Sequence, residues 1–175
     1  MEVYELDTSN LINSFVQVAK KVVTSPNDFF ENMPREGGYT NPLTFLAISV
    51  GIGGIISSLL SFNPLPLLFA LIGILFAFVG AGILQFVTQQ LFQGVGTYEG
   101  TFRVVAYTGV VSILSWIPII GLLLTLYGFY LQVIGIEKVH NVPKLKAFLA
   151  VIITLVIYFL VMVPLGGMIA IGVGR

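Results

Sequence analysis

Long uncharged apolar stretches dominate the pattern of hydrophobic and polar positions along the chain. No Asp, Glu, Lys or Arg occurs in residues 37–98, 104–136 or 147–174. Runs of roughly 20 apolar residues cross the hydrocarbon core of a bilayer as helices, because a helix satisfies its own backbone hydrogen bonds. Only 9% of the residues are charged, against about 25% in typical soluble domains. The pattern predicts an all-α, polytopic membrane helical bundle.

Turn residues divide the apolar stretches into five predicted transmembrane helices. Residues 61–66, SFNPLP, separate the first two, and the glycine-rich residues 90–103 follow the second. A single helix over residues 104–136 would be about 50 Å long, against a hydrocarbon core of about 30 Å. Trp116-Ile-Pro118 is therefore expected to divide it, and a re-entrant hairpin over residues 101–136 is the open alternative. The predicted spans cover residues 42–60, 65–91, 101–116, 118–136 and 145–172.

The N-terminal segment, residues 1–38, differs in period from the predicted five-span domain, residues 39–175. Within residues 8–24 the apolar side chains recur with the 3.6-residue period of an amphipathic helix. They are Leu11, Ile12, Phe15, Val18, Ala19, Val22 and Val23. Ser25-Pro26 resembles the start of a second helix. We expect one or two amphipathic helices at the headgroup level with their lysines outward; packing on the protein's own helices is the alternative.

The distribution of basic residues predicts the orientation in the membrane. Loops rich in Lys and Arg face the cytoplasm. With five spans, one side collects seven basic residues: Lys20, Lys21, Arg35, Arg103, Lys138, Lys144 and Lys146. The other side has only Arg175. We therefore expect a cytoplasmic N-terminus and a C-terminus on the opposite side of the membrane.

Small and polar residues within the spans predict how the helices pack. Glycines at 121, 128 and 135 recur every seven residues along the fourth span, as expected for close helix contact. A candidate polar seam between helices consists of Gln85, Thr108, Ser112, Thr125 and Gln132. Such side chains usually hydrogen-bond neighbouring helices, which stabilises the bundle by about 1 kcal/mol per bond.

Three charged residues are predicted to lie together at the cytoplasmic ends of adjacent spans. Arg103 is expected to pair with Glu99 or with Glu137, which would fix the third span against the fourth. The competing interpretation is that these are separate solvated charges at the membrane interface.

The residues needed for most catalytic chemistry are missing from the sequence. It contains no cysteine, a single histidine at His140, and aspartates only at Asp7 and Asp28, before the first span. An intramembrane protease needs paired aspartates, a serine–histidine pair or a zinc-binding HExxH sequence. We therefore expect no enzymatic activity, no cofactor and no metal site. The net charge near zero also argues against a nucleic-acid partner.

Two functional classes remain open. A basic surface of Lys20, Lys21, Lys138, His140, Lys144 and Lys146 is the candidate contact site for anionic lipids, a protein partner or a second copy of the chain. Ion-coupled carriers usually hold ionisable groups within the membrane, and the spans hold none near their centres. The alternative is therefore a passive transporter or channel, or a carrier of a small or hydrophobic solute.

Several longer motifs resemble one known family. Residues 96–108, GTYEGTFRVVAYT, followed by WIPIIG at 116–121 and YLQVIGIEKVHNVPKLKA at 130–147, resemble the Yip family of Ypt/Rab-GTPase-interacting multi-pass membrane proteins. DFFENM at 28–33 resembles the prokaryotic members. The resemblance implies five spans and a cytoplasmic N-terminus.

The resemblance also implies a functional class. Eukaryotic members are associated with Golgi traffic through binding of prenylated Rab GTPases. This chain lacks their long N-terminal region and the DLYGP motif, so GTPase binding is not carried over. A compact prokaryotic-type member is expected in the cell membrane, as a membrane-embedded interaction or organising protein in membrane trafficking or homeostasis.

Overall fold

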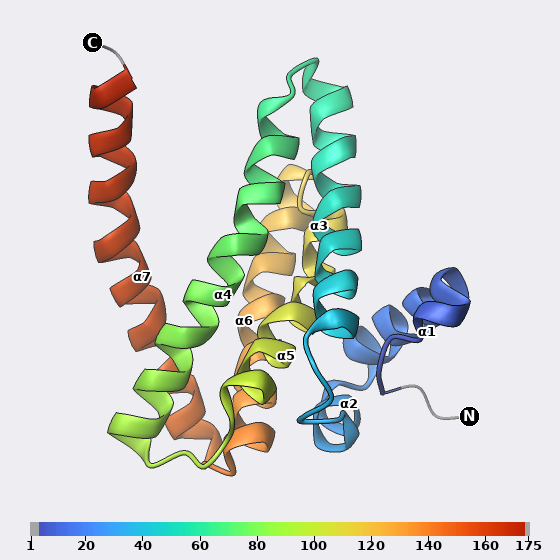
Figure 1. The fold of residues 1–175 in the computed structure, drawn as a ribbon, viewed down its shortest axis with the longest axis vertical. Helices are drawn as coiled ribbons and strands as arrows, with labels where there is room; N and C mark the ends of the chain where they lie inside the picture. Colours follow the sequence, from blue (N-terminus) through green and yellow to red (C-terminus); the bar gives the residue numbers. More distant parts are fainter. Residues whose placement is uncertain (1–3, 174–175) are drawn as a thin grey trace.

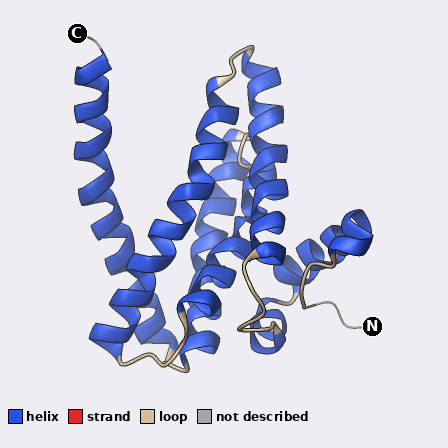
Figure 2. Cartoon of the chain, viewed as in Figure 1, coloured by secondary structure: helices blue, strands red, loops and turns tan. Residues whose placement is uncertain are grey.

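The computed structural model describes residues 4–173, with side chains as far as Val161, and every regular element in that part is a helix (Figures 1 and 2). A 3-10 turn, η1 (Thr8–Asn10), precedes the short helices of the N-terminal segment. The helices are α1 (Leu11–Thr24), α2 (Pro26–Asn32), α3 (Thr40–Ser61), α4 (Leu65–Phe92), α5 (Tyr98–Thr108), α6 (Pro118–His140) and α7 (Lys144–Val173). A second 3-10 helix, η2 (Gly109–Leu114), continues α5.

Four helices among the described residues are long and apolar enough to cross a membrane. They are α3, α4, α6 and the first part of α7, Lys144–Val161. The third predicted span covers residues 101–116, but this stretch is divided between the eleven residues of α5 and the six of η2. Since an α-helix rises about 1.5 Å and a 3-10 helix about 2 Å per residue, α5 and η2 together extend over about 28 Å. They pack between α3 and α6.

Local sequence explains where the long helices begin and end. Phe62, Gln93 and Asn141 adopt left-handed backbone conformations and close α3, α4 and α6. The amide of Gly94 donates to the Thr88 carbonyl at 3.0 Å, so it satisfies one of the free carbonyls at the end of α4. Pro118 occupies the first turn of α6, where its missing N–H is not needed.

Glycines on α6 let α5 and η2 approach closely. A Cβ atom added to Gly135 would overlap Val104 Cγ1, and one added to Gly121 would overlap the Ser115 carbonyl oxygen. A Cβ on Gly128 would lie 3.3 Å from Val111. The seven-residue glycine spacing therefore marks the contact of α6 with α5, with η2 and with the turn between η2 and α6. Small residues at such contacts let helix backbones approach closely, which favours helix association in lipid.

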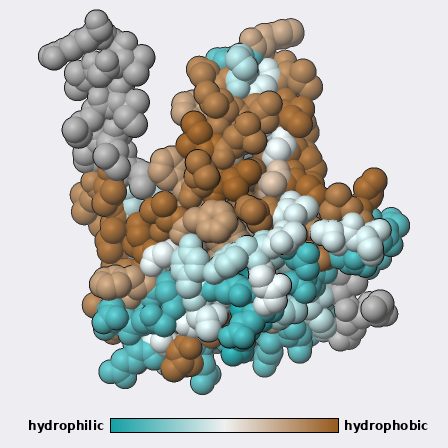
Figure 3. Space-filling model, viewed as in Figure 1, coloured by the Kyte–Doolittle hydropathy of each residue, from teal (hydrophilic) through white to brown (hydrophobic). Residues whose placement is uncertain are grey.

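The molecule has a polar end and an apolar body. Figure 3 shows hydrophobic residues over the long helices and hydrophilic residues gathered at the end where α2 lies. The turns joining α4 to α5 and α6 to α7 lie at that same end, whereas the α3–α4 turn lies at the other (Figure 1). The helix α7 packs on α4 and α6 near its start and then diverges from them. We call the polar end, formed by residues 4–39, 93–103 and 137–146, the polar cap.

Candidate functional site

Arg103 is the central ionic residue of the polar cap. Its side chain on α5 is fully buried and makes three contacts. Nη1 donates to Glu5 Oε1 at 2.6 Å, Nε to Glu99 Oε1 at 3.2 Å, and Nη2 to the Gly38 carbonyl oxygen at 2.9 Å. A buried guanidinium is tolerated only when its charge is paired and its donors are used. Arg103 therefore holds the beginning of the chain and the α2–α3 connection against α5.

The α2–α3 connection is shaped to reach Arg103. Gly37 and Gly38 have φ angles of 130° and 91°, a region that residues with a Cβ rarely adopt. The Gly38 amide donates to Glu99 Oε1 at 2.7 Å. Gly38 thus contacts both members of the Arg103–Glu99 pair, which closes a small network of charge-assisted hydrogen bonds.

The structure distinguishes between Glu99 and Glu137, the two partners predicted for Arg103 from the sequence. Arg103 pairs with Glu99, one turn earlier on the same helix, and with a second partner, Glu5, that the sequence does not indicate. The alternative pairing with Glu137 is wrong. Glu137 instead lies 3.6 Å from Lys144 at the start of α7. The reason is that Arg103 points toward the N-terminal segment, whereas Glu137 points toward the α6–α7 turn.

His140, at the end of α6, is the second buried polar group of the cap. Its Nε2 lies 2.8 Å from the Thr101 hydroxyl, which also donates to the Gln85 side-chain oxygen. Gln85 donates in turn to the Gly96 carbonyl at 2.7 Å. These bonds join α4, α5, α6 and the 93–97 loop through one connected chain of polar groups.

The sequence interpretation of His140 as a lipid or partner contact is wrong. Its side chain is completely buried beneath the 93–97 loop. A Cβ on Gly94 would lie 2.6 Å from His140 Nδ1, and one on Gly96 would lie 2.9 Å from the imidazole ring. Because the two glycines have no side chain, the loop backbone can cover the imidazole ring. The Val95 amide donates to the His140 carbonyl at 3.1 Å, which holds the loop in this position.

The remaining basic residues of the predicted contact surface fall into two groups. Lys21, Lys138 and Lys144 are ion-paired, with Asp28 at 2.5 Å, Glu31 at 2.9 Å and Glu137 at 3.6 Å. The Lys21 hydrogen bond holds the pKa of Asp28 below its ordinary value. Lys20 and Lys146 are exposed, and neither ammonium group has a partner among the residues that the structure describes. These two lysines are the free cations of the predicted surface.

The predicted amphipathic helix over residues 8–24 has two apolar stripes. Val18 and Val22 are buried against the protein, whereas Ile12 and Val16 are 79% and 58% exposed. Asn13, Gln17 and Lys20 form a separate exposed polar face. The helix α1 therefore packs on the protein's own helices and also presents an apolar stripe outward, which Figure 3 shows beside hydrophilic atoms.

The short helix α2 docks on α6. Phe29 and Phe30 are fully buried, and Phe29 packs edge-on against Tyr107 with ring centroids 5.0 Å apart. Arg35 donates to the Lys138 carbonyl at 3.0 Å, near the negative end of the α6 dipole. The Tyr127 hydroxyl donates to the Val23 carbonyl at 2.6 Å. These contacts fix the N-terminal segment to the bundle independently of Arg103.

The five residues of the candidate polar seam do not form one seam. Among them, only Gln85 has a hydrogen bond to another element of the described chain. Thr108 and Thr125 donate to carbonyls of their own helices, at 2.9 Å and 2.8 Å, because these hydroxyls reach the preceding turn. Ser112 lies beside Gly53 of α3. Gln132 lines a separate cavity between α4, α6 and α7.

The fold and the cap together define a class, a multi-pass helical membrane protein with an ordered N-terminal segment bound to one end of its bundle. The Yip1 domain matches residues 20–165, which is most of the chain. The chain therefore belongs to the Yip family. No curated protein and no solved structure matches it. The matched region runs from α1 into α7 and contains Arg103, Thr101 and His140.

Proposed function

We propose that this chain is a membrane-embedded organising protein whose polar cap binds a protein partner or a second copy at the cytoplasmic surface. The observation that carries this proposal is the Arg103 network, which orders the N-terminal segment against the bundle and so gives the cap a defined shape. Membership of the Yip family supports such a binding role.

The proposal includes a topology of five crossings. The helix α5 begins beside the polar cap, and α6 returns to the cap at His140. The chain between them must therefore travel away from the cap, and the part of α5 and η2 beyond the cap, residues 104–114, extends about 20 Å into a hydrocarbon core of about 30 Å. This topology puts the N-terminus in the cytoplasm and the C-terminus across the membrane, in agreement with the lysine and arginine distribution.

The 93–97 loop provides the most distinctive contact point on the cap. Val95 is 74% exposed, although its neighbours Gly94 and Gly96 are buried over His140. An exposed apolar residue on a loop held by backbone hydrogen bonds is a preorganised contact for a partner. The exposed polar residues of the same loop, Gln93 and Thr97, would form the rim of such an interface.

The test is chemical crosslinking in native membranes followed by purification in mild detergent. We expect the unmodified chain to crosslink to one partner species, or to itself, in a fixed ratio. The substitution Val95→Glu should reduce the crosslinked fraction at least about tenfold, because it puts a charge into an apolar contact. Gln90→Glu, which adds the same charge one turn before the loop, should retain most of it. Equal crosslinking of all three proteins would reject the cap as the binding surface.

A further inference from the structure

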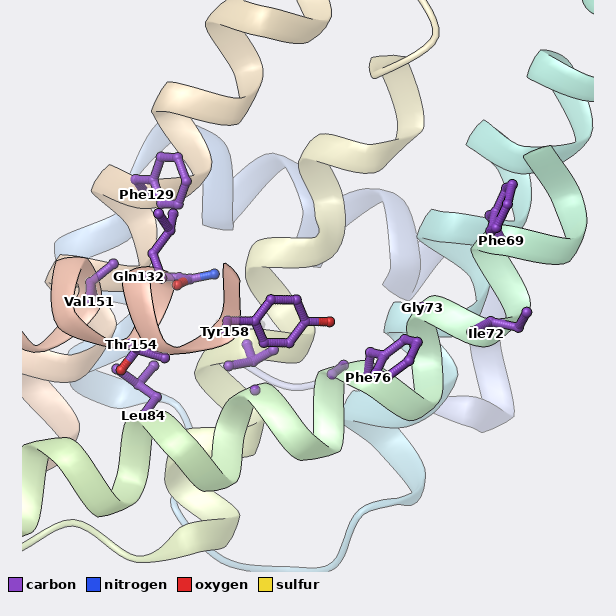
Figure 4. A pocket seen from close by; sticks show the side chains of 14 residues that line it. Phe69, Ile72, Gly73, Phe76, Leu84, Phe129, Gln132, Val151, Thr154 and Tyr158 are labelled. Carbon is purple, nitrogen blue, oxygen red and sulfur yellow. The ribbon is translucent and has the colours of Figure 1, made fainter. Parts of the chain in front are cut away.

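The apolar body contains a cavity whose lining combines apolar walls with a few polar side chains. It has a volume of about 400 Å³ and lies between α4, α6 and α7, where α7 diverges from α4 (Figures 1 and 4). Most of its lining is apolar. The large contributors are Phe69, Phe76, Leu84, Phe129 and Leu155. No Asp, Glu, Lys or Arg of the described chain lines it.

Three polar side chains line the same cavity: Gln132 of α6, and Thr154 and Tyr158 of α7. Figure 4 shows the Gln132 amide and the Tyr158 ring reaching into the space between the helices. Within the described part of the chain, neither residue makes a side-chain hydrogen bond. The Thr154 hydroxyl is buried and also has no partner there. By contrast, Thr88 donates to the carbonyl four residues earlier at 2.7 Å.

The cavity lies deep in the apolar region. Gln132 precedes the end of α6 by eight residues, and Thr154 follows the start of α7 by ten. At about 1.5 Å per residue these positions are about 12 Å and 15 Å along their helices from the ends at the polar cap, inside a hydrocarbon core of about 30 Å. Polar side chains are costly at this depth unless they find a partner. A bound molecule with a hydrogen-bonding group would provide one.

We propose that this cavity binds an uncharged lipid whose polar group is a carbonyl oxygen. The Gln132 amide nitrogen and the Tyr158 hydroxyl can each donate a hydrogen bond, so together they can bind one acceptor oxygen. The ionisable residues missing from the described lining argue against a charged headgroup, and the apolar walls accommodate a chain or ring. A fatty acyl ester and a quinone share this chemistry.

The experiment places the protein in nanodiscs whose ether-linked lipid has no ester carbonyl groups. Ethyl oleate with a ¹³C-labelled carbonyl is titrated in, and its infrared carbonyl stretch reports hydrogen bonding. A parallel titration with ¹³C-labelled decylubiquinone distinguishes the ester from the quinone. We expect saturable binding of at least one of them, at one molecule per chain, with the carbonyl stretch shifted to lower frequency.

Substitutions in the lining should separate hydrogen bonding from simple filling. Gln132→Leu and Tyr158→Phe should each weaken binding by about three- to tenfold, the effect of losing one hydrogen bond. Gly80→Leu should abolish binding, because a Cβ added at Gly80 would lie 3.9 Å from Tyr158 Cε2 and the larger side chain would extend into the cavity. Gly51→Leu on α3, where an added Cβ meets nothing within 4 Å, is the control and should bind like the unmodified chain.

Other outcomes overturn the proposal. Competition by 1-octadecene with an affinity equal to that of ethyl oleate would show an apolar cavity without carbonyl recognition. Unshifted carbonyl stretches for both probes would show that neither carbonyl is hydrogen-bonded in the cavity. Undiminished binding to Gly80→Leu would show that neither molecule occupies this site.

Discussion

At the residue scale, the polar cap depends on two buried groups of different kinds. Arg103 carries a charge whose partners come from the start of the chain and from its own helix. His140 is enclosed by glycines and bonded to Thr101. The first group holds the N-terminal segment, and the second holds the 93–97 loop. Both are therefore positioning residues for the surface that we propose to bind a partner.

Replacement of Arg103 should destabilise the protein far more than replacement of an exposed basic residue. Arg103→Met removes the guanidinium that pairs with Glu5 and Glu99 and donates to the Gly38 carbonyl, and we expect a loss of about 3–5 kcal/mol in the free energy of unfolding. Lys138→Met breaks a partly exposed pair with Glu31 and should cost about 1 kcal/mol or less. Denaturant titration in micelles, followed by fluorescence of the sole tryptophan, Trp116, measures both. Equal losses would show that Arg103 is not the central ionic residue.

Only part of this site is predictable from the sequence. Arg103 can be singled out from the sequence because it borders a long uncharged stretch. Glu99 precedes it by four residues, the spacing of neighbouring side chains on one face of a helix. Glu5 is 98 residues away from Arg103, and no local pattern connects them. The burial of His140 depends on the path of a loop from another helix, so the basic residues around it suggest exposure instead. Gly94 and Gly96 are the available signal, since paired glycines indicate close backbone approach.

At the scale of elements, the helices α1 and α5 show which structural features cannot be predicted from hydrophobic periodicity. The period of α1 predicts an apolar side, but the structure divides that side into a stripe buried on the bundle and a stripe exposed outward. The apolar run after Arg103 predicts a helix, but not its conversion to a 3-10 helix at Gly109. In contrast, proline and turn residues predict helix boundaries from local sequence alone. The structure has helix boundaries at Ser61, Pro118 and Lys144, close to the predicted positions.

The exposed apolar stripe of α1 should contact lipid. In reconstituted membranes a nitroxide label at Val16→Cys should be accessible to dissolved oxygen and shielded from a water-soluble nickel chelate. A label at Gln17→Cys, on the polar face, should show the opposite preference. The chain has no native cysteine, so each label is unique. If both positions are equally accessible to the nickel chelate, α1 lies in water and away from the bilayer.

At the scale of the whole molecule, the polar cap combines three features that face one side. They are the ordered N-terminal segment, the loop over His140 and the basic residues of the helix ends. The long helices behind the cap expose apolar side chains, as expected for contact with the lipid bilayer. The body is therefore the part in contact with lipid, and the cap is the surface that we propose to bind a partner.

The two unpaired lysines should dominate any attraction of the cap to anionic lipids. Each basic residue near an anionic surface contributes about 1 kcal/mol, so Lys20→Gln and Lys146→Gln should each lower the retention of phosphatidylglycerol about fivefold. Lys138→Gln, which removes a paired charge, should have a smaller effect. Native mass spectrometry of the protein released from mixed-lipid nanodiscs counts the retained lipids. A uniform response to all three substitutions would contradict the distinction between free and paired lysines.

The most direct test of the central claim, a single cytoplasmic cap joined to five crossings, is labelling of single cysteines in intact cells with a membrane-impermeant maleimide. Ser61→Cys at the end of α3 and Ser115→Cys between η2 and α6 should be labelled without permeabilisation. Asn32→Cys and Gln90→Cys, both at the polar end, should be labelled only after the membrane is opened. Labelling of Ser115→Cys together with Asn32→Cys and Gln90→Cys, and not with Ser61→Cys, would show that α5 and η2 do not cross the membrane and would contradict the five-crossing topology.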